Sequence, residues 1–599
     1  MCGIAGILES AGSDRDTLLS RLEALTTALQ HRGPDDRGTW VAPDGVAGLA
    51  HVRLSILDLS GAGHQPMPTP EGTLHITFNG EIYNFQELRA ALERDGVAFH
   101  TRTDTEVLLR LYERDGTAML AKLRGMFAFA IWDSAKRCCF LARDPLGIKP
   151  LYYTMRGGRL AFASELRALQ AAGLTGSDLD AGALMGYFQT GSVAEPHTLL
   201  ANVHSLEAGH YLLWEDGRLA KRCYWQIEFR PEKFTAEQAV TEVRSALLDS
   251  MRAHFVSDVP VGVFLSGGID STALVALARE LGQSNLATFS IGVDDDSIDE
   301  SSMARRTAAH FGTQHHELCL DATAARGLFD AFLQAMDQPG IDGLNTFTVS
   351  SFARQQGMKV VLSGLGGDEL FAGYKSFDAV PRLASAAKLA VLVPGLGSAA
   401  GWMMERLCPS HKLRRIGSLL QKPATIQNAG ACFRGIFSAY EARLLAAKYL
   451  DCSPANIQAW PDRPLLASDP RDAVSECELR FYMRNQLLKD SDVMSMAHGL
   501  ELRVPLVDQM LFRRLARIPA ARRLRSGKQI LLEAVPEIPE WVSGATKRGF
   551  VFPFEKWLKE QWGESFARAT VHAPFKNPTW YQRWSIVMLD TWLEHHSIN

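Results

Sequence analysis

Short apolar runs that end in glycines set the strongest limit on the fold of this chain. Residues 259–265 form an apolar run too short for a helix, and a Ser-Gly-Gly turn follows at 266–268. Leucines and alanines over residues 271–282 then lie on one face of a predicted helix that ends in glycine. Residues 286–293 predict a second strand, and residues 359–362 a third, again followed by glycines and a helix. This order predicts a parallel α/β sheet with ligands at the carboxyl ends of its strands.

Residues 1–185 show a different pattern, of short strands and turns around a few helices. Aromatic or β-branched runs bounded by turn residues predict three strands, and apolar periodicity predicts two helices. The predicted strands are 74–78, 127–132 and 151–153, and the predicted helices are 15–29 and 105–112.

The length and these changes of pattern predict a multidomain protein. A chain of 599 residues is too long for one ordinary core, so about two to four domains are expected. We predict one domain at residues 1–200, a connector with a strand or two at 201–240, and a second domain at 241–599. Alanine, leucine and arginine dominate beyond residue 380, which predicts a helical C-terminal region.

The charge balance and the cysteines exclude several classes of protein. With 63 basic and 67 acidic residues, the net charge of −4 gives no bulk electrostatic reason to expect nucleic acid or membrane binding. Nine cysteines without a CxxC pair fit neither a disulfide framework nor a zinc site, which favours a reducing cytosol. The N-terminus has no positive leader, and Lys388 and Pro394 interrupt the most apolar later window. We therefore predict a cytoplasmic protein.

Cys2 is the first candidate catalytic residue. Removal of Met1 would make it the terminal residue, and an α-amine has a pKa of roughly 7.7–8. Such an amine can accept the thiol proton and later pass it to a leaving group. A cysteine at position 2 could also be accidental. The motifs that follow it in the sequence therefore determine whether a catalytic role is predicted.

Six motifs follow Cys2 in order, and together they resemble the class II glutamine amidotransferases. The motifs are HRGPDDRG at 31–38, RLSILD at 53–58, FNGEIYN at 78–84, TDTE at 103–106, GMFAFAIW at 125–132 and RDPLGIKP at 143–150. The resemblance implies that Asn79 and Gly80 form an oxyanion hole, from a side-chain amide and a backbone N–H. It also implies that Arg53 binds the glutamine carboxylate through its planar fork, and that Glu81 and Asp104 hold the glutamine ammonium.

The glycine turn in the second half carries a further motif, SGGIDST at 266–272. Small residues before a helix let backbone amides approach a pyrophosphate, and the helix N-terminus favours negative charge. The sequence contains no G-x-x-x-x-G-K-[ST], so it predicts no P-loop for γ-phosphate transfer. The motif instead resembles the PP-loop of ATP pyrophosphatases, which attack the α-phosphate.

A second loop, SGLGGDELFAGY at 363–374, extends the resemblance to the glutamine-hydrolysing asparagine synthetases. The segment 490–508 also matches that family. The resemblance implies that Asp270 and Asp368 ligate Mg²⁺ and that Lys547 steadies the pyrophosphate. The residues that it places around ATP are Leu265, Ser266, Gly267, Gly268, Asp270, Ser271, Ile291, Ser363 and Gly364.

The resemblance covers nearly the whole chain and implies both fold and activity. It implies an N-terminal-nucleophile αββα glutaminase domain, then a PP-loop ATP pyrophosphatase-like parallel α/β domain with a helical C-terminal region. Cys2 would release ammonia from glutamine, and ATP would adenylate the acceptor carboxylate with loss of pyrophosphate. The implied small-molecule partners are glutamine, ATP and aspartate, and a homodimer is compatible with the resemblance.

Leu365 departs from the family pattern and leaves the acceptor open. In the best-known asparagine synthetases a glutamate occupies this position, so the adenylate site here lacks one acid, which Glu369 or Asp337 could supply. Aspartate is the first expectation for the acceptor. The alternative is another carboxylate, such as a uronic acid or a peptide intermediate. A non-catalytic descendant is disfavoured by the intact Cys2 and Asn79.

Overall fold

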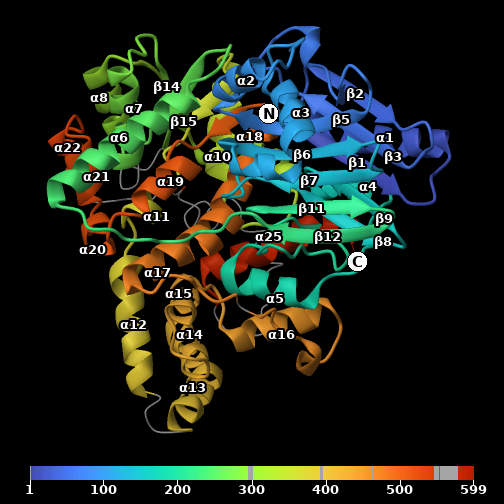
Figure 1. The fold of residues 1–599 in the computed structure, drawn as a ribbon. Helices are drawn as coiled ribbons and strands as arrows, with labels where there is room; N and C mark the ends of the chain where they lie inside the picture. Colours follow the sequence, from blue (N-terminus) through green and yellow to red (C-terminus); the bar gives the residue numbers. More distant parts are fainter. Residues whose placement is uncertain are drawn as a thin grey trace.

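A computed structural model describes residues 2–293, 301–390, 395–461, 463–545, 552 and 578–598. Within them, two antiparallel six-stranded sheets form the N-terminal half, and a parallel five-stranded sheet lies in the half that follows (Figure 1). None of the described helices is both long enough and apolar enough to cross a membrane.

The first sheet has the order β10-β8-β9-β1-β3-β2 and the second the order β12-β11-β7-β6-β5-β4. The strands of the first are β1 (Gly3–Glu9), β2 (Asp36–Val41), β3 (Ala47–Arg53), β8 (Tyr152–Arg156), β9 (Arg159–Ala163) and β10 (His204–Ser205). Those of the second are β4 (Met67–Pro68), β5 (Leu74–Ile82), β6 (Gly125–Asp133), β7 (Cys138–Arg143), β11 (His210–Glu215) and β12 (Arg218–Cys223). Strands β10 to β12 lie in the expected connector at 201–240 and are part of these sheets.

Alternating side chains stack the two sheets between helices. Ile4 of β1 packs with Trp132 of the second sheet, whereas Ile7 of β1 faces the other way and packs with Leu18 of α1 (Arg15–Leu29). Helices α4 (Leu166–Ala171) and α5 (Ala181–Thr190) share that outer core. Helices α2 (Phe85–Arg94) and α3 (Asp104–Asp115) cover the outer face of the second sheet. The layers are therefore helix, sheet, sheet and helix.

The parallel sheet has the order β15-β14-β13-β16-β17. Its strands are β13 (Val261–Phe264), β14 (Ala287–Val293), β15 (Gln314–Leu320), β16 (Val360–Leu362) and β17 (Glu501–Arg503). Helices α6 (Ala236–His254), α7 (Ile269–Glu280) and α8 (Ser301–Phe311) pack on one face, and α10 (Leu344–Gln355) packs on the other. This is a parallel α/β domain covered on both faces.

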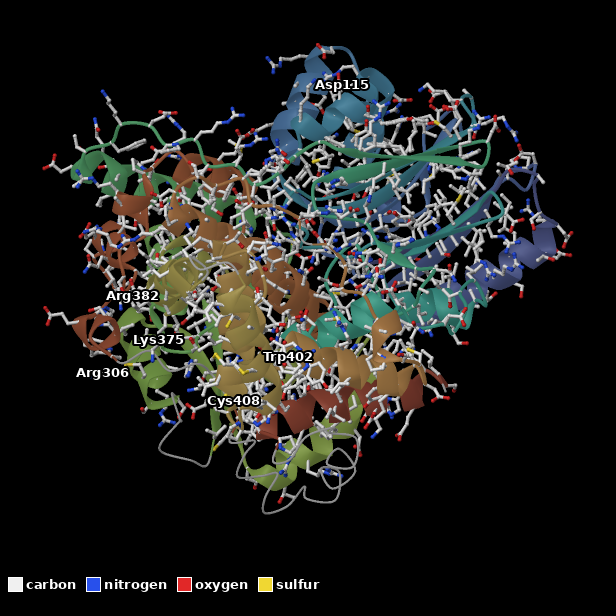
Figure 2. All side chains as sticks on the ribbon, turned by 90° about the horizontal axis from the view of Figure 1, so that it is seen from below. Asp115, Arg306, Lys375, Arg382, Trp402 and Cys408 are labelled. Carbon is white, nitrogen blue, oxygen red and sulfur yellow. The ribbon has the colours of Figure 1, made fainter. Side chains whose placement is uncertain are left out.

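Helices dominate the rest of the chain. Three of them, α12 to α14, project from the body (Figure 1), and Trp402 of α13 is 49% exposed (Figure 2). The described elements are α9 (Ala322–Ala335), α11 (Gly367–Leu370), α12 (Ser376–Ala390), α13 (Leu396–Leu407), α14 (His411–Leu420), α15 (Ile426–Arg434), α16 (Ala439–Tyr449), α17 (Pro470–Cys477), a π-helical segment (Glu478–Leu488), α18 (Lys489–Met496), α19 (Gln509–Leu515), α20 (Ala520–Arg523), α21 (Gln529–Ala534), α22 (Glu540–Ser543) and α25 (Trp580–His595). The predicted fold class is confirmed, including the helical C-terminal region.

Candidate active sites

Cys2 lies just before β1 and is 8% exposed, so its side chain is almost enclosed. Its backbone nitrogen donates to Asn79 Oδ1 at 3.0 Å. The other end of that amide, Asn79 Nδ2, is buried and has no hydrogen-bond partner among the described residues. Burial raises the pKa of the Cys2 thiol, and the Leu54 amide and Arg53 oppose the rise. A buried amide donor with nothing to bond beside a cysteine is suited to an oxyanion.

Glu81 lies next to the last residue of β5, and the carboxylate of Asp104 is close enough for its charge to act on Glu81. Asp104 begins α3, and its Oδ2 accepts the Ile82 amide at 2.9 Å. Burial raises the pKa of Asp104 to about 6. Burial, followed by the nearby charge of Glu501, raises the pKa of Glu81 well above its usual range. Two buried carboxyls that resist ionisation would be stabilised by an ammonium group.

Gly80 and Arg53 are the remaining residues that were predicted to bind glutamine. A Cβ at Gly80 would lie 2.1 Å from the carbonyl oxygen of Met126, so the close packing of β5 against β6 requires glycine. Arg53, at the end of β3, donates from Nη1 to the Ser60 carbonyl at 2.9 Å and from Nη2 to the Leu57 carbonyl at 3.2 Å. The structure thus brings the predicted residues to one end of the stacked sheets.

Arg32 is a residue of this site to which the sequence assigned no role. Its side chain is fully buried, and its Nε donates to the Cys2 carbonyl at 3.1 Å. The other two nitrogens donate at 2.7 Å to Glu165 and to Asp492 of α18. Asp492 also accepts from Lys149 at 3.2 Å. The backbone of the cysteine is therefore connected through one side chain to the helical region of the second half. The only sequence feature that could have pointed to Arg32 is its place in the HRGPDDRG motif at residues 31–38.

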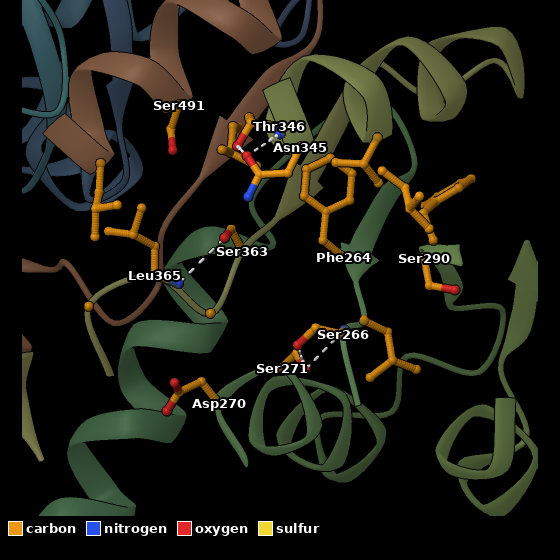
Figure 3. Close-up of a pocket in the computed structure, with 18 of the residues that line it drawn as sticks. Phe264, Ser266, Asp270, Ser271, Ser290, Asn345, Thr346, Ser363, Leu365 and Ser491 are labelled. Atoms are coloured by element: carbon orange, nitrogen blue, oxygen red, sulfur yellow. Dashed lines mark hydrogen bonds between the residues drawn. The ribbon is translucent and has the colours of Figure 1, made fainter. Parts of the chain in front are cut away.

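The second site is a pocket of about 340 Å³ at the carboxyl ends of β13, β14 and β16. Ser290 lies at one end and Leu365 and Ser491 lie at the other, with Ser363 between them (Figure 3). Most residues predicted for ATP line this pocket: Leu265, Ser266, Asp270, Ser271, Ile291, Ser363 and Gly364. Gly267 and Gly268 lie in the same turn, and the Gly268 amide donates to Ser266 Oγ at 3.4 Å.

Glycines let the two loops of this pocket pack against each other. A Cβ at Gly364 would lie 2.9 Å from Asp270 Cβ, and one at Gly367 would lie 2.2 Å from Asp270 Oδ1. A Cβ at Gly373 would lie 1.8 Å from Asp368 Oδ1. Because no larger residue fits there, the SGLGGDELFAGY loop sets Asp368 beside Asp270.

Lys528 joins these two aspartates. Its Nζ forms an ion pair with Asp270 and another, at 2.6 Å, with Asp368 Oδ1. Burial opposes its charge, but the two carboxylates raise the pKa of Lys528. The lysine also has a left-handed backbone, with φ of 59°, directly before α21. Such a conformation is uncommon for a residue with a Cβ and persists where surrounding contacts hold it. The sequence pointed to Lys547, which lies outside the described residues.

The carboxylates fit a divalent cation only in part. No group of three or more His, Cys, Asp or Glu side chains that could hold a metal exists in the described parts of the chain. Asp270 and Asp368 offer hard oxygen ligands at one point, so further ligands would have to come from phosphate oxygens.

Of the two acids considered as replacements near Leu365, the structure supports one. Glu369 is 1% exposed, lines the pocket, and accepts a hydrogen bond from Tyr374 at 2.9 Å. Burial, followed by the charge of Asp368, raises the pKa of Glu369 to about 8. Asp337 is not a pocket residue, and its carboxylate accepts the backbone amides of Leu166 and Arg167. The suggestion of Asp337 was wrong because motif position says nothing about this contact between distant segments.

Comparison with known proteins matches both halves. A glutamine amidotransferase domain model matches residues 1–225, and an asparagine synthase model matches residues 242–583. Asparagine synthetase [glutamine-hydrolyzing] 1 of Bacillus subtilis is 33% identical, over 94% of this chain and 89% of the relative. A putative asparagine synthetase [glutamine-hydrolyzing] of Mycobacterium bovis is 34% identical, over 95% and 90%. Amidase chry2 of Gibberella zeae is 34% identical over 63% of this chain and 60% of its own. The chain therefore belongs to the glutamine-hydrolysing asparagine synthetase family.

Proposed function

We propose that this protein converts aspartate, ATP, glutamine and water to asparagine, AMP, pyrophosphate and glutamate through a β-aspartyl-AMP intermediate. The observation that carries the proposal is the presence of two different sites in one chain. One is a buried cysteine beside the unbonded Asn79 amide. The other is a pocket of about 340 Å³ whose loop aspartates meet Lys528. We assign the glutaminase to residues 1–200, with β10 to β12 of the expected connector 201–240 extending its sheets, and adenylation to residues 241–599.

At the first site, Cys2 acts as the nucleophile on the glutamine amide. Loss of Met1 turns the nitrogen that now lies 3.0 Å from Asn79 Oδ1 into an α-amine, which takes up the thiol proton. Asn79 Nδ2 and the Gly80 amide stabilise the oxyanion. Glu81 and Asp104 hold the glutamine ammonium, and Arg53 its carboxylate. The tetrahedral intermediate then collapses to a γ-glutamyl thioester as the α-amine returns its proton to the departing ammonia, and water hydrolyses the thioester to glutamate and the free thiol.

At the second site, the chain activates the acceptor by adenylation. Leu265, Ile291 and Ser363 contact the nucleoside, and the turn at Ser266–Ser271 contacts the phosphates. Asp270 and Asp368 would hold Mg²⁺, which supplies charge neutralisation at the triphosphate. Lys528 stabilises the negative charge on the departing pyrophosphate. We assign stabilisation of the pyrophosphate to Lys528 rather than to Lys547, because Lys528 contacts both aspartates.

The cleavage point in ATP tests the adenylation mechanism. AMP and pyrophosphate are the expected products, in a one-to-one ratio with the amide, because the chain has no Walker lysine for γ-phosphate transfer. Chromatographic separation of the nucleotides after turnover, with a pyrophosphate assay, measures both. Stoichiometric ADP and orthophosphate would exclude the mechanism.

Leu365 supports a second candidate, amidation of another carboxylate by the same chemistry. If aspartate is the acceptor, Leu365→Glu should lower aspartate-dependent pyrophosphate exchange by less than about tenfold, because Glu369 already supplies an acid to this pocket. If the acceptor is bulkier or less polar, the added charge is buried against it and should lower the rate much further. Leu365→Gln, which has nearly the same size without the charge, is the matched control. Undetectable exchange at millimolar aspartate in the unmodified enzyme, with its glutaminase intact, would exclude aspartate.

A further inference from the structure

Helix α13 is one of the three projecting helices, and it carries a row of exposed apolar side chains. Leu396, Met403 and Leu407 are between 51% and 72% exposed, and Ala399 is exposed between them. Steps of three and four residues place these four side chains on one face of the helix, and we call them the apolar stripe. Leu389, at the adjoining end of α12, is also exposed. The adjoining ends of α12 and α13 lie farthest from the body of the protein (Figure 1).

The opposite face of α13 packs on α14. A Cβ at Gly401 would lie 2.6 Å from the carbonyl oxygen of Gly417, so these glycines let the two helices approach closely. One turn further along α13, the buried carboxylate of Glu405 accepts hydrogen bonds from Ser418 Oγ at 2.6 Å and from Gln421 Nε2 at 2.7 Å. These contacts fix the rotation of α13 about its axis, so the apolar stripe faces away from α14. None of the hydrophobic core clusters in the described parts of the chain contains a residue of the stripe.

Positively charged side chains accompany the apolar stripe. Four exposed cations belong to the same three helices: Arg382 and Lys388 of α12, Arg406 of α13 and Lys412 of α14. Arg406 Cζ lies 4.7 Å from the centroid of the Trp402 ring, which is itself half exposed. This pair stands beside the stripe, because each of the two residues directly precedes a stripe residue in the chain. Helix α13 therefore presents apolar, aromatic and positive groups together to solvent.

The charge of the projecting helices is opposite in sign to that of the whole chain. Helices α12 to α14 contain six lysines and arginines and two acids, whereas the chain has a net charge of −4. Of the two acids, Glu405 is buried, and Asp378 lies in the first turn of α12, where it accepts a hydrogen bond from Ser526 at 3.4 Å. The charge balance of the whole chain, which gave no reason to expect membrane binding, therefore conceals a local excess of positive charge.

We propose that the apolar stripe and the exposed cations of α12 to α14 bind the surface of a membrane that contains acidic phospholipids. A contiguous row of exposed apolar side chains marks an interaction site. Apolar side chains flanked by cations fit the boundary between acyl chains and anionic headgroups, where tryptophan is also favoured. The helix would lie on the membrane, since its 12 residues are fewer than the roughly 20 needed to cross. This inference goes beyond the proposed function and does not depend on it.

A second copy of the chain is the other occupant that the stripe could have. In a symmetric contact through the stripe, each copy would bring the same exposed cations of α12 to α14. Like charges brought together in this way disfavour the contact. An anionic lipid surface supplies the complementary charge, so the charge distribution favours the membrane.

Binding of the purified protein to lipid vesicles tests the proposal. One set of vesicles contains phosphatidylcholine and phosphatidylglycerol in equal amounts, and the other contains phosphatidylcholine alone. In cosedimentation we expect a Kd at least about tenfold lower for the acidic vesicles, because each cation near an anionic surface strengthens binding. High salt should weaken this binding, because it screens exposed charges. Equal binding to both sets of vesicles, or binding to neither, would overturn the proposal.

Substitutions in the apolar stripe locate the contact. Leu396→Ser combined with Leu407→Ser should raise the Kd for acidic vesicles at least about tenfold, because two leucines no longer enter the apolar layer. Leu466→Ser, at a leucine of similar exposure outside the projecting helices, is the matched control and should bind like the parent. Unchanged glutamine hydrolysis and pyrophosphate exchange show that each variant is folded. Parental affinity in the double variant would show that the stripe is not the contact, and the proposal would be wrong.

A second pair of substitutions tests the cations. Lys388→Glu combined with Lys412→Glu should remove the preference for acidic vesicles, because the surface beside the stripe loses its excess of positive charge. Lys233→Glu, at an exposed position far from these helices in the sequence, is the control and should keep the preference. An unchanged preference in the double variant would contradict the role of the cations.

Sedimentation velocity without lipid tests the second copy as occupant. We expect the same sedimentation coefficient for the parent and for the variant that carries Leu396→Ser and Leu407→Ser, because the stripe makes no contact between copies. Self-association that this variant abolishes, in a protein that does not bind acidic vesicles, would assign the stripe to a contact between copies and overturn the membrane proposal.

Discussion

Replacing Cys2 with alanine should abolish glutamine-dependent amide synthesis and leave synthesis from ammonium salts intact. The loss should be about a thousandfold or more, because no other group can form the acyl intermediate once the nucleophile is removed. The second site should be unaffected, since Cys2 does not line that pocket and the groups that act on its thiol include Leu54, Arg53 and Glu81 of the first half. Product amide is measured with saturating glutamine in one series and with concentrated ammonium chloride in the other.

The control is Cys223→Ala, which removes an exposed cysteine of β12 and should retain both activities. Cys2→Ser tests the thiol itself, because a hydroxyl of similar size remains. A Cys2→Ala enzyme that hydrolyses glutamine at the parent rate would show that the nucleophile is elsewhere. Loss of the ammonium-dependent reaction as well would show that the substitution disturbs the fold.

Helices and strands that depend on local sequence patterns could be predicted from the sequence. The helix at 15–29 corresponds to α1, and the run 359–362 contains β16, because amphipathic periodicity and short apolar runs act over neighbouring residues. The resemblance to the class II glutamine amidotransferases also assigned Cys2 and Asn79 to one site, and in the structure the Cys2 backbone nitrogen donates to Asn79 Oδ1.

Contacts between distant segments could not be predicted in this way. Arg32 reaches Asp492, which is 460 positions away, and nothing in either segment specifies the partner. Lys528 was missed for a related reason, because it follows a short loop and precedes a helix of only six residues. Its importance comes from the left-handed backbone and from two carboxylates on remote loops.

Lys528→Ala should lower both glutamine-dependent and ammonium-dependent synthesis by about a thousandfold or more. Two effects act together. The variant loses a cation that stabilises negative charge on the departing pyrophosphate, and a single such donor is typically worth about a hundredfold to a thousandfold. It also leaves Asp270 and Asp368 facing each other without the ammonium between them, which disfavours the loop arrangement. Pyrophosphate exchange measures the loss, and glutamine hydrolysis shows that the first site still folds.

A charge-retaining variant separates the two effects. Lys528→Arg keeps the positive charge but replaces a compact ammonium by a planar guanidinium. Compared with Lys528→Ala, it should therefore restore the ion pairs with the two aspartates more fully than it restores the rate of pyrophosphate exchange. Lys388→Ala, at an exposed position of α12, is the matched control and should leave exchange unchanged. If Lys528→Ala retains exchange within tenfold of the parent, the lysine is a structural bridge between two loops. The cation that neutralises pyrophosphate would then have to come from elsewhere, and Lys547 would be the next position to test.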